Sequence, residues 1–171
     1  MLHPNIDRRE MADSYKMDPE KWSRQLSRAE CPFCRPREDD NSFCSKIATL
    51  GCSTLYLSKD QRFEWRSLLI FDARHAVGLD SLSENEHADF CRDLRAASQA
   101  LKSATGCELA NAASLGNQIA HLHFHLIPRS PQDPRWAAPL WTTSPDEIQA
   151  RTLAESELLA LLQRIASLIA F

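Results

Sequence analysis

Three histidines occupy alternate positions in residues 121–128, whose sequence is HLHFHLIP, and this segment restricts the fold more than any other. Successive side chains of a β-strand point to opposite faces, so an extended conformation places His121, His123 and His125 on one face. The apolar residues between them then hold the strand against a core. Neighbouring imidazoles would lie roughly 6–7 Å apart, which suits an extended anionic ligand. The alternative is an edge strand whose solvent face carries histidine by chance.

The composition is that of an ordinary globular protein. The chain has 171 residues, 43% hydrophobic and 25% charged, enough for one domain with an extension and a substantial core. The net charge of −3 offers no basic face for duplex nucleic acid. No segment is long and continuously apolar enough to span a membrane. From the charge and this absence together, we expect neither nucleic acid nor a membrane as partner. Six cysteines in a chain without a recognisable export signal favour a cytoplasmic protein.

The strand patterns predict an α+β fold with an antiparallel sheet. Residues 53–57 and 67–71 are rich in β-forming residues and flank a polar segment, as expected of an antiparallel pair. A further strand is predicted around residues 108–113. A turn at residues 114–117 then leads to the histidine strand.

Three helices are predicted from local signals. A short helix begins at Asp18, an N-cap residue followed by proline, and ends near Cys31. The long helix begins at Ser83, carries apolar residues at steps of four and three, and ends at Gly106. A last helix begins at Ser144, and its wide apolar face needs a partner, either the core of the same domain or a second subunit.

A pair of cysteines, Cys31 and Cys34, has the spacing that zinc sites use. A tetrahedral site needs two more ligands, and His75 and His121 stand at suitable places, the first at the end of a strand. Zinc is favoured over free thiols. It is also favoured over a redox motif, because a thioredoxin-like site begins a long helix after a strand.

These residues together resemble the histidine-triad (HIT) family of nucleotide-binding proteins. The family signature is His-apolar-His-apolar-His followed by two apolar residues, and residues 121–127 match it in full. The upstream strand and glycine turn and the segment 136–141 give further similarity. The resemblance implies an α+β fold, usually a homodimer, that acts on nucleotides linked through an α-phosphate. We expect three parts: a leader with a short helix (1–30), a HIT-like domain (31–141) and a C-terminal helical extension (142–171).

The resemblance also implies a structural zinc ion. Zinc-bearing members, and the related galactose-1-phosphate uridylyltransferases, use a Cys-x-x-Cys pair, a histidine after a strand and the first triad histidine. By position these ligands are Cys31, Cys34, His75 and His121. A closed set of four ligands would fix the strand and leaves no open position for Lewis-acid chemistry. Uridylyl transfer between sugar phosphates is disfavoured, because those relatives carry glutamine where this chain has His125.

The resemblance makes His123 the nucleophile and His125 the residue that contacts the phosphate and the leaving atom. Neutral imidazole is a competent nucleophile near pH 7, since its unperturbed pKa is about 6.5. Attack on the α-phosphate would give a nucleotidyl-histidine. We therefore expect a hydrolase or nucleotidyl transferase that cleaves a nucleoside phosphoramidate or a dinucleoside polyphosphate. The alternative is a nucleotide-binding regulatory module with little turnover.

Five further residues are candidates for substrate binding. The backbone amides around Gly116, Asn117 and Gln118 could donate to phosphoryl oxygens. Asn111 is placed like a polar family residue near the phosphates, and Asp60 resembles the acidic residue that bonds the ribose hydroxyls. Many hydrolytic members carry Gly-Gln, or Gln and a small hydroxyl residue, just before the triad. The Asn117–Gln118 pair departs from this pattern and motivates the binding-module alternative.

Overall fold

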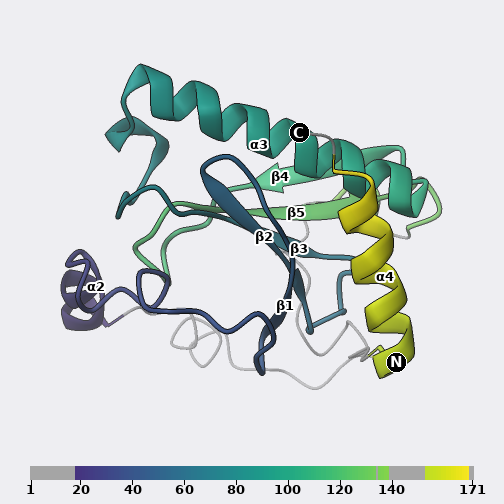
Figure 1. Ribbon diagram of the computed structural model, residues 1–171, viewed down its shortest axis with the longest axis horizontal. Helices are drawn as coiled ribbons and strands as arrows, with labels where there is room; N and C mark the ends of the chain where they lie inside the picture. Colours follow the sequence, from purple (N-terminus) through teal and green to yellow (C-terminus); the bar gives the residue numbers. More distant parts are fainter. Residues whose placement is uncertain (1–17, 134, 139–152, 170–171) are drawn as a thin grey trace, which may run out of the picture.

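The computed structural model describes residues 18–133, 135–138 and 153–169. Five strands form one antiparallel sheet in the order β1-β2-β3-β5-β4, and the long helix α3 lies across one side of it (Figure 1). The predicted α+β fold is confirmed. The strands are β1 (Cys44–Thr49), β2 (Ser53–Ser58), β3 (Ser67–Phe71), β4 (Leu109–Ala113) and β5 (His123–Arg129).

The predicted antiparallel pair is the hairpin β2–β3, in which Leu55 lies opposite Leu69. The edge strand β1 was not predicted. Its register with β2 shifts between Lys46 and Ala48, so the regular alternation of a strand is interrupted within six residues. The strand nevertheless completes the sheet on the side away from β5.

The long helix α3 (Glu84–Thr105) follows the sequence prediction closely. Ser83 and Glu86 form the capping box, with the Ser83 amide donating to the Glu86 carboxylate at 2.8 Å. Gly106 ends the helix in the left-handed conformation, at a φ of 71°. A single 3-10 turn, η1 (Leu79–Ser81), precedes the helix.

The first described helix, α2 (Pro19–Gln25), begins where the sequence predicted, because the Asp18 carboxylate accepts from the Glu20 amide at 2.9 Å. It ends at Gln25 and does not continue to Cys31. The Gln25 side chain is buried and accepts from the Ala120 amide at 3.0 Å, which ties the end of the helix to the segment before the triad. The turns after it bring Cys31 back to the sheet, with the Cys31 amide donating to Ser27 at 3.1 Å.

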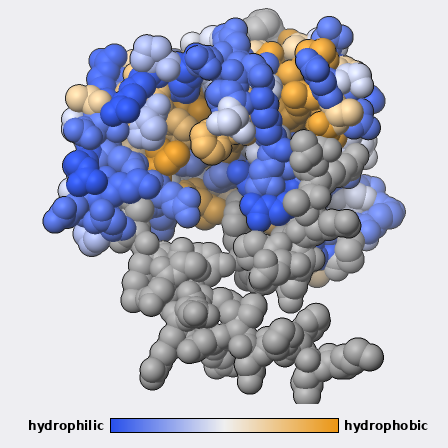
Figure 2. All heavy atoms as spheres, turned by 90° about the horizontal axis from the view of Figure 1, so that it is seen from below, coloured by the Kyte–Doolittle hydropathy of each residue, from blue (hydrophilic) through white to orange (hydrophobic). Residues whose placement is uncertain are grey.

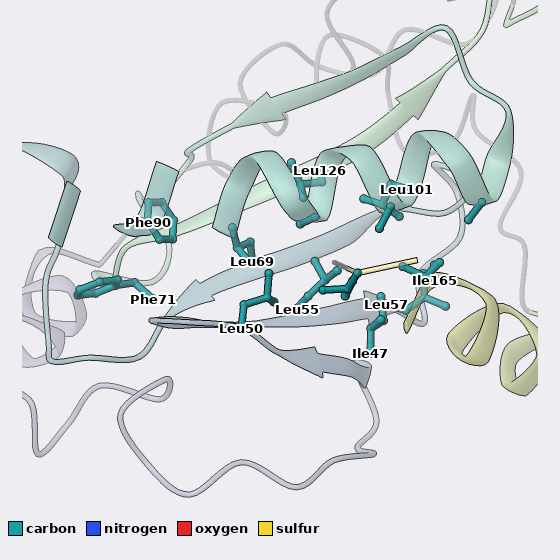
Figure 3. Packing of buried hydrophobic residues seen from close by; sticks show 14 of the residues in the cluster. Ile47, Leu50, Leu55, Leu57, Leu69, Phe71, Phe90, Leu101, Leu126 and Ile165 are labelled. Atoms are coloured by element: carbon teal, nitrogen blue, oxygen red, sulfur yellow. The ribbon is translucent and has the colours of Figure 1, made fainter. Parts of the chain in front are cut away.

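The hydrophobic core lies between the sheet, α3 and α4 (Figure 3). The last helix, α4 (Glu155–Ser167), contributes Leu161 and Ile165 to this core. The partner of its apolar face is therefore the same domain. The predicted start at Ser144 and the predicted boundary at 141/142 lie outside the described residues. The described helix begins at Glu155, with the Glu157 carboxylate accepting from the Ala154 amide at 3.0 Å.

The opposite side of the sheet carries a smaller apolar cluster. Cys44, Tyr56 and Ile70 are buried there, and Phe33 and Leu68 pack against them. Seen from the side away from α3, the described surface is mostly hydrophilic with smaller hydrophobic areas (Figure 2). None of the helices in the described part of the chain is long and apolar enough to cross a membrane.

Candidate functional site

The three triad histidines keep the alternation that the sequence predicted, although only two of them lie in the strand. β5 begins at His123, so His121 stands just before it. Leu122 is fully buried on the α3 side of the sheet, and Phe124 packs against the same core. The rings of His123 and His125 lie on the other side, with their centroids 5.3 Å apart. The apolar residues thus hold the histidine segment against the core, as expected.

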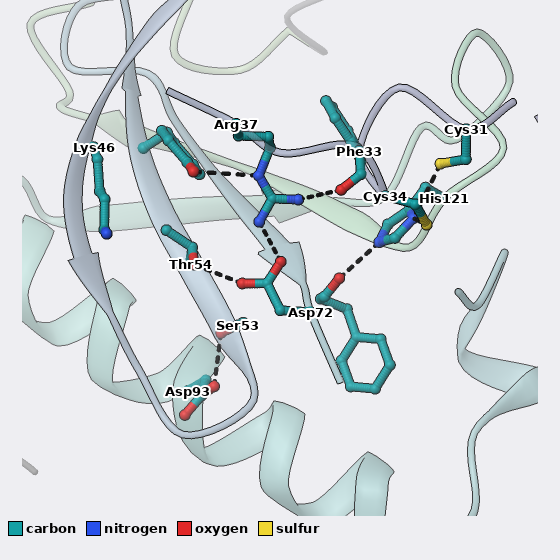
Figure 4. Close-up of polar contacts among 12 residues, drawn as sticks. Cys31, Phe33, Cys34, Arg37, Lys46, Ser53, Thr54, Asp72, Asp93 and His121 are labelled. Atoms are coloured by element: carbon teal, nitrogen blue, oxygen red, sulfur yellow. Dashed lines mark hydrogen bonds and ion pairs between the residues drawn. The ribbon is translucent and has the colours of Figure 1, made fainter. Parts of the chain in front are cut away.

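The ring of His121 is oriented by a backbone carbonyl. Its Nε2 lies 2.6 Å from the carbonyl oxygen of Phe71, which can only accept a hydrogen bond, so Nε2 carries the proton. The other nitrogen, Nδ1, is then the one with a free lone pair. It lies 3.3 Å from Cys31 Sγ and 3.5 Å from Cys34 Sγ (Figure 4).

His75 joins this group from the segment after β3. The Leu122 amide donates to the Ala76 carbonyl at 2.6 Å, which brings the two histidine-bearing segments together. The Nδ1 atom of His75 lies 3.3 Å from Cys34 Sγ. The ligand atoms of the four residues predicted to bind zinc all lie within 4.8 Å of one another. The structure therefore assembles the whole predicted ligand set.

The arrangement of these four residues fits a zinc ion. Tetrahedral zinc with Zn–S of about 2.3 Å and Zn–N of about 2.0–2.1 Å places sulfur and nitrogen ligands about 3.5 Å apart, close to the separations observed here. Burial, together with the neighbouring Cys31, raises the pKa of Cys34 to about 11. The Cys34 thiol thus resists ionisation unless a cation compensates for its charge. The cluster is a candidate zinc site of two cysteines and two histidines.

Arg37 ties the two-cysteine segment to the sheet, and sequence reasoning missed this role. Its Nε donates to the Tyr56 hydroxyl at 3.2 Å, and its other nitrogens bond the Phe33 carbonyl and the Asp72 carboxylate (Figure 4). Asp72 in turn accepts from the Thr54 hydroxyl at 2.5 Å. Residues 35–40, with the sequence RPREDD, have the run of charges that is typical of a solvated loop, and the sequence alone gives no sign that one arginine folds inward.

His123 has its lone pair on the outer ring nitrogen. Nδ1 lies 2.7 Å from the His121 carbonyl oxygen and must donate to it, which leaves Nε2 unprotonated in the neutral ring. The side chain is only 5% exposed, and this burial lowers its pKa below the ordinary value. Phe33 packs edge-on against the ring, with the centroids 5.2 Å apart. The ring is therefore fixed in orientation and neutral at pH 7.

His125 is also held neutral. Burial lowers its pKa to about 3, and the charges of Arg66 and His123 act in the same direction. A neutral imidazole can donate one hydrogen bond to an atom of a ligand, but it is not a reservoir of imidazolium protons at pH 7.

The predicted phosphate-binding turn lies in the loop between β4 and β5. β4 ends with Ala113 paired to His125, and the chain then returns to His121, so the intervening loop connects the two ends of the triad. Gly116 lies in this loop. The side chains of Asn117 and Gln118, which complete the predicted set, are exposed.

The other two predicted substrate-binding residues already have polar partners. Asn111 lies opposite Ile127, and its side-chain oxygen accepts from Arg129 at 3.4 Å. Asp60 lies in the β2–β3 loop, where Arg62 bonds its two carboxylate oxygens at 2.9 and 2.7 Å and lowers its pKa. Arg66 approaches Asp60 at 3.5 Å, and sequence reasoning did not single it out.

Comparisons with known proteins agree with this fold and triad. The HIT domain family matches residues 44–132, and the chain belongs to this family. A histidine triad protein from Bradyrhizobium japonicum is 27% identical, with 79% of this chain and 100% of that chain covered and a TM-score of 0.66. A histidine triad (HIT) protein from Sinorhizobium meliloti 1021 is 23% identical, with 91% and 97% covered and a TM-score of 0.64. No curated protein matches the chain.

A Zn-bound histidine triad family protein from Mycobacterium smegmatis shares the fold at 16% identity, with 82% of this chain and 96% of that chain covered and a TM-score of 0.58. At this level of identity the similarity concerns the fold alone. The case for zinc in the present chain therefore rests mainly on its own four ligand atoms.

Proposed function

We propose that the chain is a nucleotide hydrolase or nucleotidyl transferase that cleaves at the α-phosphate of a nucleoside phosphoramidate or a dinucleoside polyphosphate. The observation that carries this proposal is the hydrogen bond from His123 Nδ1 to the His121 carbonyl, because it leaves Nε2 with its lone pair. Burial lowers the pKa of His123, so the lone pair is available at physiological pH. Membership of the HIT family supports a nucleotide as the ligand.

The proposed reaction has two displacements at phosphorus. His123 Nε2 attacks the α-phosphorus, a P–N bond forms, and the bond from phosphorus to the bridging oxygen or nitrogen breaks with its electron pair on the leaving group. Water or another acceptor hydroxyl then attacks the same phosphorus. The P–N bond breaks, the acceptor loses its proton, and His123 is regenerated as the nucleoside monophosphate or its ester departs.

The neighbouring groups would stabilise the charge that develops in each step. We assign His125 to the bridging atom, to which its neutral ring donates one hydrogen bond. The backbone amides of Gly116, Asn117 and Gln118 are assigned to the phosphoryl oxygens, where fixed donors act most strongly. Asn111 and Asp60 are assigned to the phosphates and the ribose, and each would have to share oxygen atoms that arginines already contact.

A zinc ion held by Cys31, Cys34, His75 and His121 would have a structural role, because four protein ligands leave no open position. When bound, it would fix the ring of His121 and the two-cysteine segment relative to the sheet. The chain's own contribution is to hold the His121 backbone in place, and this backbone carries the carbonyl that orients His123.

We also propose a homodimer in the cytoplasm, as the family resemblance and the composition imply. The edge strand β4 carries Leu109, which is 47% exposed, and this exposure supports an interface there. The apolar face of α4 offers no such support, because Leu161 and Ile165 pack into the same domain. Sedimentation as a monomer at micromolar concentration would contradict the proposal.

The test of the nucleophile is a His123→Ala variant assayed with an adenosine phosphoramidate and with diadenosine polyphosphates. We expect turnover to be lost, together with any phosphorus-labelled covalent intermediate trapped by a rapid quench in alkaline denaturant, because a P–N bond to histidine is labile in acid. The matched control is His87→Ala, because His87 is an exposed histidine of α3 on the opposite side of the sheet. Equal rates for the wild type and the His123→Ala variant would refute the role of His123.

The second candidate function is a nucleotide-binding regulatory module with little turnover. The exposed Asn117 and Gln118 side chains favour it, since many hydrolytic relatives carry a different pair before the triad. Tight binding of a nucleoside monophosphate without any labelled intermediate would support the module over the enzyme.

A further inference from the structure

Arg66 stands beside the triad strand without belonging to any predicted site. It is the last residue before β3, whose next residues Ser67 and Leu68 pair with Leu126 and His125. The guanidinium is close enough to lower the pKa of His125. Arg66 therefore lies on the far side of His125 from His123.

The charge of Arg66 is poorly compensated. The side chain is only 19% exposed, and its buried Nε has no hydrogen-bond partner among the described residues. Asp60 approaches at 3.5 Å, but Arg62 already bonds both oxygens of this carboxylate. An arginine stays protonated even when burial lowers its pKa, so Arg66 places beside His125 a cation whose carboxylate partner among the described residues is shared with Arg62.

Two other arginines with little exposure, Arg37 and Arg129, have several hydrogen-bond partners each. Arg37 bonds a hydroxyl, a carbonyl and the Asp72 carboxylate. Arg129, which is 4% exposed, bonds Asp133 at 2.8 Å and also the Asn111 side chain. Arg66 lacks comparable partners within the described part of the chain, and a role in stability does not explain its burial.

The loop that carries Arg66 is held in a costly conformation. Trp65 has a φ of 66°, in the left-handed region that bulky residues avoid. Its amide donates to the Gln61 side chain at 2.8 Å, and the same side chain donates to the Ser58 carbonyl at 2.5 Å. Gln61 is 2% exposed, so this brace is internal. The loop thus fixes the direction in which the Arg66 side chain leaves the backbone.

We propose that Arg66 binds an anionic phosphate oxygen of the nucleotide beside His125 and makes the site select nucleotides over nucleosides. This inference rests on the proposed function. His123 and His125 are neutral and offer only single hydrogen bonds, whereas a guanidinium presents a planar set of donors that matches phosphate. Arg66 supplies the positive charge that the two imidazoles lack.

The experiment compares the binding of the four common nucleoside 5′-monophosphates and their nucleosides by calorimetry. For the base that binds, we expect Arg66→Gln to weaken monophosphate binding by about ten- to a hundredfold and to leave nucleoside binding unchanged. Arg66→Lys should restore part of the loss. The charge-matched control is Arg92→Gln, because Arg92 is 73% exposed on α3 and lies across the sheet. An unchanged preference for the monophosphate in Arg66→Gln would overturn the proposal.

A stability measurement separates this role from a structural one. Since its buried Nε is unpartnered among the described residues, Arg66→Met should leave the melting temperature unchanged or raise it. A clear fall would instead mark Arg66 as structural. Calorimetry does not depend on turnover, so the two proposals can fail separately: an active enzyme whose Arg66→Gln variant keeps its phosphate preference would retain its function and lose only this assignment.

Discussion

Asp93 is the buried carboxylate whose loss we expect to cost the most stability outside the core. It lies on α3, is 7% exposed and accepts three hydrogen bonds from the β1–β2 turn: Gly51 N at 3.1 Å, Cys52 N at 2.8 Å and Ser53 Oγ at 2.6 Å (Figure 4). Hydrogen bonds to a charged group contribute about 1.5–3 kcal/mol each, and water can replace part of them at a turn. We therefore expect Asp93→Ala to lower the free energy of unfolding by about 3–5 kcal/mol.

The assay is urea unfolding followed by circular dichroism, with a thermal melt alongside. For a chain of this size about 1 kcal/mol corresponds to 2–4 °C, so the melting temperature should fall by roughly 6–20 °C. Asp89→Ala is the control on the same helix, because Asp89 is 47% exposed and its ion pair among the described residues is with the exposed Arg92. It should change stability by less than about 0.5 kcal/mol. A loss below about 1 kcal/mol for Asp93→Ala would refute the reasoning from its three bonds.

Three further predictions concern the metal, pH and α4. Cys34→Ser should lose bound zinc in metal analysis and melt at a lower temperature, and an unchanged zinc content would contradict the ligand set. The pKa of His125 is about 3 when folded and near 6.5 when unfolded, so the unfolded chain binds more protons below pH 6.5. Stability should therefore fall by about 2 kcal/mol from pH 7.5 to 5, and His125→Gln should remove this part in urea titrations. Leu161→Ala should cost about 2–5 kcal/mol, whereas Leu159→Ala, at a position 52% exposed, should cost little.

The elements that could be predicted from the sequence are those whose signals are local. The capping box at Ser83 and the glycine at position 106 stand directly before and directly after α3. The edge strand β1 has no such signal, because the irregularity between Lys46 and Ala48 disrupts the period of two. Its pairing depends on the tertiary fold.

The candidate site also contains residues that the sequence predicts and residues that become apparent only in the fold. The spacing of Cys31 and Cys34, together with the resemblance to the HIT family, predicted with His75 and His121 a ligand set that the fold then assembles. Arg66 could not be singled out, because its burial follows from the braced loop around Trp65 and not from any pattern of charges. Charged residues are usually solvated, so burial of this one is visible only in three dimensions.

Because His121 lies just before β5, its backbone and ring make contacts that differ from those of the other two triad histidines. If β5 began at His121, the carbonyl of this residue would be positioned for the hydrogen-bond ladder of the sheet. Instead its Nε2 bonds Phe71, its Nδ1 faces the cysteines, and its carbonyl accepts from His123 Nδ1. One residue thus joins the candidate zinc site to the tautomer of the proposed nucleophile. The candidate zinc ligands and the proposed nucleophile are therefore joined through His121, so that fixing the His121 backbone also fixes which nitrogen of His123 keeps its lone pair.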